Sequence, residues 1–318
     1  MSSNDTLDMG CHAYEEGIST SYGYIPSEAA GIAFCVLFGL SAIVHIIQFS
    51  WKRTWWCSVF TVGSMANTPN VEVLGWAARL WAAYCPYNST AFMIQISTLI
   101  IAPTFYTAGI YVLLGRFIQL FGPNSSMLSP KLYLWIFCTC DVISLVIQAA
   151  GGGLASSASD EVNGNTAPGT NTMVAGIVFQ LASITVFIFC AIDFFRRALR
   201  LGYIDALVKG PVSYLVGAMV LSVVCIYIRS IYRTIELAQG WSGYLITHQS
   251  YLIGLDGVMM CIAVGVFNVF HPGRLLPKEL LFVVPNEQAS FETVNDSEVQ
   301  KLHASTNPST EYTGYGHR

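Results

Sequence analysis

Charged residues are scarce in this 318-residue chain, in which Asp, Glu, Lys and Arg make up 11% of the positions. A soluble globular domain carries about 25% charged residues. Apolar residues make up 53% of the chain, and its mean hydropathy is +0.53. With so little charge the chain cannot coat a water-facing surface of this size, which excludes soluble enzymes, nucleic-acid-binding proteins and disordered proteins. The composition predicts an all-α membrane protein.

The sequence also lacks the motifs of membrane enzymes. It has no Walker A pattern, and its last long apolar stretch, 245–270, has no lysine that could bind retinal. It has only six histidines, and three of them, His45, His248 and His271, are expected at different depths. A catalytic zinc needs several ligands at one depth. We therefore expect no enzyme, no catalytic residue, no metal site and no cofactor, and we interpret His45 as a core residue.

Seven apolar stretches are long enough to cross a bilayer, since a spanning helix needs about 20 residues. The second is interrupted by Asn67, Pro69, Asn70 and Glu72. We interpret it as one bent helix because a proline inside a helix kinks it. The sequence thus predicts a bundle of seven transmembrane helices. The expected spans are 28–49, 56–81, 90–114, 132–154, 172–195, 212–238 and 245–270.

The regions outside this transmembrane domain, 28–271, are polar. The N-terminal tail, 1–27, has no apolar signal-peptide core, so the first span must act as the insertion signal. Residues 155–171, rich in Ser, Gly and Asn, predict an exposed loop. The preceding Gly151-Gly152-Gly153 either ends a helix or permits close packing. The C-terminal tail, 272–318, is expected to be disordered, because prolines break any helix at its start and it lacks an apolar core.

The basic residues outside the spans all fall on one side of the predicted bundle. Twelve of the 15 Lys and Arg residues lie in the tails and loops of that side, and none lies on the other. Because Lys and Arg concentrate in cytoplasmic loops, we expect the N-terminus outside and the C-terminus in the cytoplasm. The plasma membrane is the expected location, and a vacuolar membrane fits the same topology.

The predicted outer side carries two possible modifications. Asn4 and Asn88 begin glycosylation sequons, although Asn88 lies so close to a span that we do not expect it to be used. Cys11 and Cys85 are the two cysteines, of nine, on this side. An oxidising environment allows a disulfide between them, with two free thiols as the alternative.

The predicted spans contain three arginines, and the carboxylates considered with them are Glu72, Asp141, Glu236 and Asp256. A charge at the bilayer centre costs about 2.5–3.5 kcal/mol on insertion scales, so these groups should face the bundle interior and pair. Arg229, Arg233 and Glu236 share one helix face through their i, i+4 and i+7 spacing. Glutamines in the predicted spans are candidates together with these charged residues. The candidate binding residues are Glu72, Arg79, Gln95, Asp141, Gln148, Gln180, Arg229, Arg233, Glu236, Gln249 and Asp256.

These residues predict a polar chamber inside the bundle, displaced toward the outer leaflet. Arg229 and Arg233 suit an anionic or hydroxylated head group, whereas carboxylates such as Asp256 suit an amine. The alternative is a set of structural ion pairs that fix helix packing. Ala102-Pro103, in the third span, predicts a kink that is either a hinge or a static bend.

Several motifs occur in order between Tyr22 and Gly273. They are Tyr22-Gly23-Tyr24-Ile25-Pro26-Ser27, Glu72-x-x-Gly75-x-x-x-Arg79, Gln95 with Ala102-Pro103, Tyr111 and Arg116, Asp141-x-x-Ser144-x-x-x-Gln148-x-x-Gly151-Gly152-Gly153, Arg229-x-x-x-Arg233-x-x-Glu236, Gly240, Gly243, Asp256, and His271-Pro272-Gly273. In this order the chain resembles the RTA-like family of fungal seven-helix lipid-translocating exporters. One departure is Gln249, where the family often has a glutamate seven residues before the aspartate of the last helix.

The resemblance implies export or flipping of sphingoid long-chain bases, resistance to sterol analogues and drugs, and in one branch porphyrin traffic. The first hypothesis is therefore a translocator whose partners are membrane lipids and whose polar chamber receives the head of an amphipathic lipid. A second is a seven-helix lipid sensor or receptor that signals through cytoplasmic loops such as 194–210. A third is a porphyrin- or heme-binding transporter, for which the dispersed histidines offer little axial ligation. No nucleic-acid partner is expected, and the sequence indicates no oligomeric state.

Overall fold

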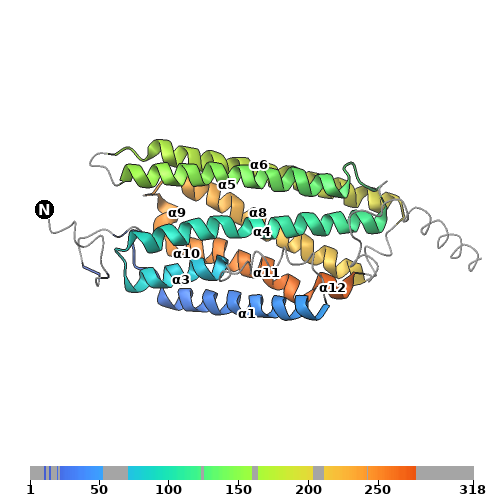
Figure 1. Ribbon diagram of the computed structural model, residues 1–318, viewed down its shortest axis with the longest axis horizontal. Coiled ribbons are helices and arrows are strands. Elements are labelled where there is room, and N and C mark those ends of the chain that lie inside the picture. The colour runs from blue at the N-terminus through green and yellow to red at the C-terminus, as the bar shows by residue number, and fades with distance from the viewer. Residues whose placement is uncertain are drawn as a thin grey trace, which may run out of the picture.

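The computed structural model describes residues 11, 14, 15, 20, 22–52, 71–122, 125–159, 164–202, 211–241 and 243–276. These residues form helices and no strand (Figure 1), which confirms the all-α class for this part of the chain. The predictions for Asn4, for most of the N-terminal tail and for the C-terminal tail beyond residue 276 lie outside the described residues.

Six segments are long and apolar enough to cross a membrane. They run side by side along the long axis of the molecule in Figure 1. α3 (Val71–Tyr84) is a further helix of 14 residues and is the described part of the predicted second span. The start of that span, with Asn67 and Pro69, lies outside the described residues. The six segments are α1 (Glu28–Lys52), α4 (Ser89–Phe121), α5 (Pro130–Ser159), α6 (Ala167–Arg200), α8 (Pro211–Ala238) and 249–275.

The interior and the surface of the bundle are inverted relative to a soluble protein. α4 is the most buried of the six candidate spans and lies between the α5–α6 pair and the layer of α1, α3 and α11 (Figure 1). The outer faces expose large aliphatic side chains, for example Leu40 at 56% and Val146 at 64%, while Arg79 is 0% exposed. Apolar groups outside and charges inside suit a hydrocarbon solvent.

The loop predicted at 155–171 is largely helical, so this prediction was wrong. α5 continues to Ser159 and α6 begins at Ala167. Contact between the two backbones explains the extension: a Cβ on Gly151 would lie 2.4 Å from Met173 N, and one on Gly169 would lie 2.3 Å from Ala155 N. The triple glycine therefore lies within a helix, and its first member, Gly151, permits close packing of α5 against α6.

The last predicted span, 245–270, is broken near its N-terminal end. α9 (Tyr244–Thr247) and α10 (Gln249–Tyr251) flank His248, whose extended backbone has φ −114° and ψ 97°. A π-helix, η3 (Leu252–Val258), follows and leads into α11 (Met259–Val269). Short π-helical segments are rare and occur frequently at functional sites.

The prolines after the last span do not prevent a further helical turn, contrary to expectation. Pro272 begins α12 (Pro272–Leu275), a position at which its missing N–H leaves no hydrogen bond unmade. His271 caps the turn, because its Nδ1 accepts from the N–H of Gly273 at 3.1 Å.

The N-terminal segment is attached to the turn between α3 and α4. A disulfide joins Cys11 to Cys85 across a sequence separation of 74 residues. Tyr87 Oη accepts from the N–H of Glu15 at 2.9 Å. In the same turn Asn88 caps α4, its side chain accepting from the N–H of Ala91 at 3.2 Å.

We expect Cys85→Ser to lower the free energy of unfolding by about 2–4 kcal/mol, because the disulfide restricts the unfolded chain. Thermal unfolding of the purified protein with and without reductant measures the effect. Cys140→Ser is the matched control, since Cys140 is a free cysteine. Peptide mapping without reductant that finds Cys11 and Cys85 both alkylated would contradict the prediction.

Candidate functional site

A network of ion pairs lies between α8 and η3. Arg229 Nε is 2.6 Å from Asp256 Oδ1, and Arg233 Nε is 3.4 Å from the same oxygen. Arg233 Nη1 is 2.7 Å from Glu236 Oε2. All four side chains are buried. The spacing on α8 placed the two arginines and Glu236 on one face, and the tertiary structure adds Asp256 between the arginines.

Glu72 adds a fifth charged residue to this network of ion pairs, and Tyr232 adds a neutral hydrogen-bond donor. Glu72, on α3, is 1% exposed and lies within electrostatic range of Arg229, Arg233 and Asp256. Tyr232 Oη donates to Glu236 Oε1 at 2.6 Å. With every group ionised, three carboxylates against two guanidinium groups give the cluster a formal charge of −1. We use the name charged cluster for Glu72, Arg229, Arg233, Glu236 and Asp256.

Pro103 links the charged cluster to α4. A proline has no N–H, so the carbonyl of Leu99, four residues earlier, has no partner within the helix. Arg229 Nη2 donates to that carbonyl oxygen. The missing N–H of Pro103 therefore leaves a hydrogen-bond acceptor for a buried arginine.

Glycine explains how η3 fits beside this cluster. A Cβ on Gly257 would lie 2.7 Å from ring atoms of Phe34 and Trp76. Those two rings stack with centroids 4.1 Å apart. The neighbouring Asp256 is thus held on a π-helical turn that packs directly against aromatic side chains of α1 and α3.

Arg79 lies in a second group and has neutral partners. Its Nη2 donates to Tyr24 Oη at 2.9 Å and to Gln249 Oε1 at 3.0 Å. Its Nη1 is 3.4 Å from Gln95 Oε1. The rings of Tyr22 and Tyr24 lie 5.5 and 5.6 Å from the guanidinium carbon, within cation–π range. Arg79 forms no ion pair with any residue that the structure describes.

Tyr22 and Tyr24 belong to the first sequence motif but were not among the predicted site residues. Tyr22 Oη donates to Gln95 Oε1 at 2.7 Å. Burial raises the pKa of the Tyr22 phenol, so it keeps the proton that it donates. Glu72 and Arg79 are seven residues apart and so lie on one face of α3, but they belong to different groups, since Glu72 is part of the charged cluster.

A third group joins α4, α5 and α6 through hydroxyl and amide groups. Asp141 accepts hydrogen bonds from Thr107 Oγ1 at 3.0 Å and Tyr111 Oη at 3.1 Å. Gln148 Nε2 donates to Gln180 Oε1 at 3.1 Å, and Gln180 Nε2 donates to Thr104 Oγ1 at 3.2 Å. The three hydroxyl partners were not among the predicted site residues, because isolated Thr and Tyr residues carry no pattern that distinguishes them.

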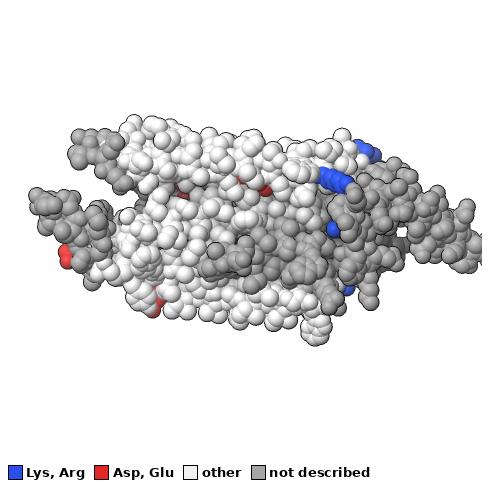
Figure 2. All heavy atoms as spheres, viewed as in Figure 1, with Lys and Arg blue, Asp and Glu red and all other residues white. Residues whose placement is uncertain are grey.

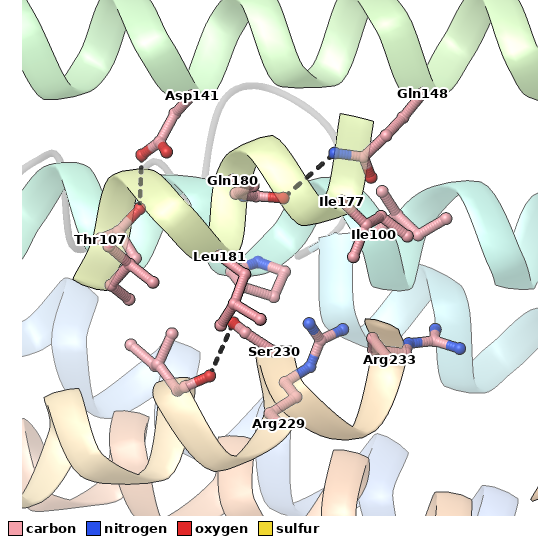
Figure 3. A pocket seen from close by; sticks show the side chains of 13 residues that line it. Ile100, Thr107, Asp141, Gln148, Ile177, Gln180, Leu181, Arg229, Ser230 and Arg233 are labelled. Atoms are coloured by element: carbon pink, nitrogen blue, oxygen red, sulfur yellow. Dashed lines mark hydrogen bonds between the residues drawn. The ribbon is translucent and has the colours of Figure 1, made fainter. Parts of the chain in front are cut away.

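A small cavity separates this third group from the charged cluster (Figure 3). Its volume is about 30 Å³, which is room for about two water molecules. Among the described residues this cavity is far smaller than the chamber that the sequence predicts. Its polar lining includes five of the predicted residues, with apolar residues such as Ile100 and Leu181 between them. The five are Asp141, Gln148, Gln180, Arg229 and Arg233.

Two of the three histidines are closer together than expected. The rings of His45 and His271 lie with centroids 6.4 Å apart, whereas His248 contacts Tyr244 and Thr247, so the dispersion expected of the three histidines is corrected only for the first two. Among the described residues, no three His, Cys, Asp or Glu side chains form a group that could hold a metal ion.

These features define a multi-pass membrane protein whose helices enclose charged and amide groups around a small amphipathic cavity. The chain belongs to the RTA1-like protein family, whose family model matches residues 60–279. The family resemblance found in the sequence is thereby confirmed.

Three relatives from Saccharomyces cerevisiae are similar over most of the chain. The sphingoid long-chain base transporter RSB1 is 32% identical over 284 residues, which cover 79% of this chain and 73% of that protein. Protein RTM1 is 29% identical over 283 residues, and protoporphyrin uptake protein 1 is 29% identical over 281 residues. Each of these two alignments covers 78% of this chain and 90% of the relative. No solved structure matches the chain.

Proposed function

We propose that this protein is a membrane translocator of amphipathic lipids of the sphingoid long-chain base type, and that it is not an enzyme. The observation that carries the proposal is the charged cluster beside an amphipathic cavity, in a chain 32% identical to a sphingoid long-chain base transporter. A long-chain base is an amino alcohol with one hydrocarbon chain. Carboxylates of the cluster suit its amine, and Arg229 and Arg233 suit its hydroxyl groups.

Translocation requires the cavity to open, since about 30 Å³ cannot hold the head of a lipid. Opening requires α4 to move away from α8, which separates Arg229 from the Leu99 carbonyl. The extended backbone at His248 and the π-helix η3 are two places where the last span can change its conformation. A polar interior then lowers the barrier that hydrocarbon presents to a charged head group.

We further propose seven spans, an outside N-terminus, a cytoplasmic C-terminus and a plasma-membrane location. α3 together with the residues before it supplies the seventh span. The Cys11–Cys85 disulfide supports an outside N-terminus, because disulfides persist in oxidising compartments. Figure 2 shows the visible Lys and Arg side chains gathered at the opposite end of the molecule, as the positive-inside rule requires of a cytoplasmic side.

Reconstitution tests the proposed translocation. The purified protein in proteoliposomes is expected to accelerate redistribution of a labelled long-chain base between leaflets. Glu236→Gln should slow that rate at least tenfold, because Arg233 and Tyr232 lose their charged partner. Asp193→Asn is the matched control, since Asp193 and Arg197 form an exposed ion pair on α6, 2.7 Å apart. A folded wild-type protein that produces no acceleration would refute the function.

A porphyrin ligand is the second candidate. It is favoured by the similarity to protoporphyrin uptake protein 1 and by the proximity of His45 and His271. If the protein binds a heme through these side chains, addition of hemin to the purified protein should shift its Soret absorbance band, and His45→Ala should abolish the shift. An unchanged spectrum at saturating hemin would exclude the candidate.

A further inference from the structure

A groove of about 270 Å³ lies on the outside of the bundle between α1 and α11. It shares no lining residue with the cavity beside the charged cluster. None of the described residues that line it is charged. On α1, Leu37 is 52% and Leu40 56% exposed, so the groove is open toward the surrounding lipid. The groove is lined by Leu37, Phe38, Leu40, Ser41, Val44, Cys261, Val264, Gly265 and Asn268.

Three buried polar atoms without hydrogen-bond partners among the described residues lie at this end of α1 and α11: one on Asn268, which lines the groove, and one each on Gln48 and His45, which are outside its lining. Asn268 Nδ2 donates to Ser41 Oγ, but its Oδ1 is buried and has no hydrogen-bond partner within the described residues. Gln48 Nε2 donates to the backbone oxygen of Asn268 at 2.8 Å, and Gln48 Oε1 is likewise buried and unpaired. His45 Nε2, three residues before Gln48 on the same helix face, is a third such atom.

The hydrogen-bonding capacity of these atoms determines which kind of lipid head group can bind. Amide oxygens only accept hydrogen bonds, so a head that satisfies Asn268 and Gln48 must carry several N–H or O–H donors. A phosphate head supplies acceptors and would need a cation, which the groove lacks among the lining residues that the structure describes. The single hydroxyl of a sterol can donate only one hydrogen bond. An amino-alcohol head carries enough donors for both amides.

We infer that the groove between α1 and α11 binds a single-chain lipid with an amino-alcohol head. The hydrocarbon chain lies along Leu40, Leu37 and Val264, and the head donates to Asn268 Oδ1 and Gln48 Oε1. The choice of this lipid rests on the proposed function. The groove and its unpaired acceptors are observed independently of that function. The groove is thus a binding site for a lipid that arrives sideways from one leaflet.

The groove lies next to the charged cluster. Cys261, which lines the groove, is within electrostatic range of Glu72. Glu72 is in turn within range of Arg229 and Asp256. α11 also continues directly from η3, the helix that carries Asp256. A lipid held in the groove would therefore lie against the helix that continues from the segment carrying Asp256.

Photocrosslinking in proteoliposomes of the full-length protein tests this site. The probe is a long-chain base with a diazirine in its hydrocarbon chain, and labelled peptides are identified by mass spectrometry. We expect labelling within 37–44 and 261–268 that unlabelled long-chain base displaces. Asn268→Leu should reduce the labelling at least fivefold, because it removes the acceptor and keeps the volume, and Asn268→Asp should retain it. Ser157→Ala is the control, since that hydroxyl bonds only to the Gly153 oxygen of its own helix, at 3.0 Å.

Several results would overturn the proposal that this groove binds the lipid. Labelling spread over all lipid-facing helices, or labelling that Asn268→Leu leaves unchanged in a protein with wild-type thermal unfolding, would overturn it. Stronger displacement by a sterol than by the long-chain base would also overturn it. The translocation rate is measured in the same vesicles. Translocation without labelling in the groove refutes only the groove, and saturable labelling without translocation refutes only the proposed function.

Discussion

Asp256→Asn is expected to lower the free energy of unfolding by about 3–5 kcal/mol, the usual effect of removing one partner from a buried ion pair. Asp256 Oδ1 lies 2.6 Å from Arg229 Nε and 3.4 Å from Arg233 Nε. Without that carboxylate, less negative charge remains to neutralise the two buried guanidinium groups of Arg229 and Arg233. Thermal unfolding of the purified protein in detergent measures the loss, and translocation by this variant should fall to background.

A double variant separates stability from function. Arg229→Gln with Asp256→Asn removes one charge of each sign, so we expect it to recover most of the lost stability, since the two residues are in contact and their effects are not additive. If the charged cluster binds the head group, translocation should remain at background in this stable protein. Full recovery of translocation would show instead that the ion pair is structural, which is the alternative left open by the sequence.

Gly151→Ala is expected to lower the free energy of unfolding by about 1–3 kcal/mol or more. The added Cβ would lie 2.4 Å from Met173 N and 2.7 Å from Gly169 O, which are backbone atoms of α6. The two helices can accommodate it only by moving apart. Thermal unfolding is again the measurement, and the translocation rate shows whether this contact also supports the site.

The neighbouring glycines provide matched controls, at which we do not expect alanine to lower the free energy of unfolding. A Cβ on Gly152 or Gly153 would meet nothing within 4 Å. Alanine is favoured over glycine in a helix interior by about 1 kcal/mol, so Gly152→Ala and Gly153→Ala should leave stability unchanged or raise it. Equal losses at all three positions would show that the contact between α5 and α6 is not the cause.

Several features of the site follow from local sequence alone. The spacing of Arg229, Arg233 and Glu236 is a helical period, so their common face needs no knowledge of other helices. Pro103 predicts a kink because proline lacks an N–H. The acceptor for Arg229 that the missing N–H leaves was not predictable, since Leu99 and Arg229 lie 130 residues apart in the chain.

The sequence by itself determined that this chain is a membrane protein, where most of its long helices run and that its buried charges face inward. Each of these follows from composition and helical period, which are local properties. The tertiary structure alone decided that Asp256 bridges two arginines, that Arg79 has neutral partners, and that Gly151 lies inside a long helix. These three features depend on which side chains from distant segments of the chain come into contact. Such neighbours also determine the free energy of a buried charge.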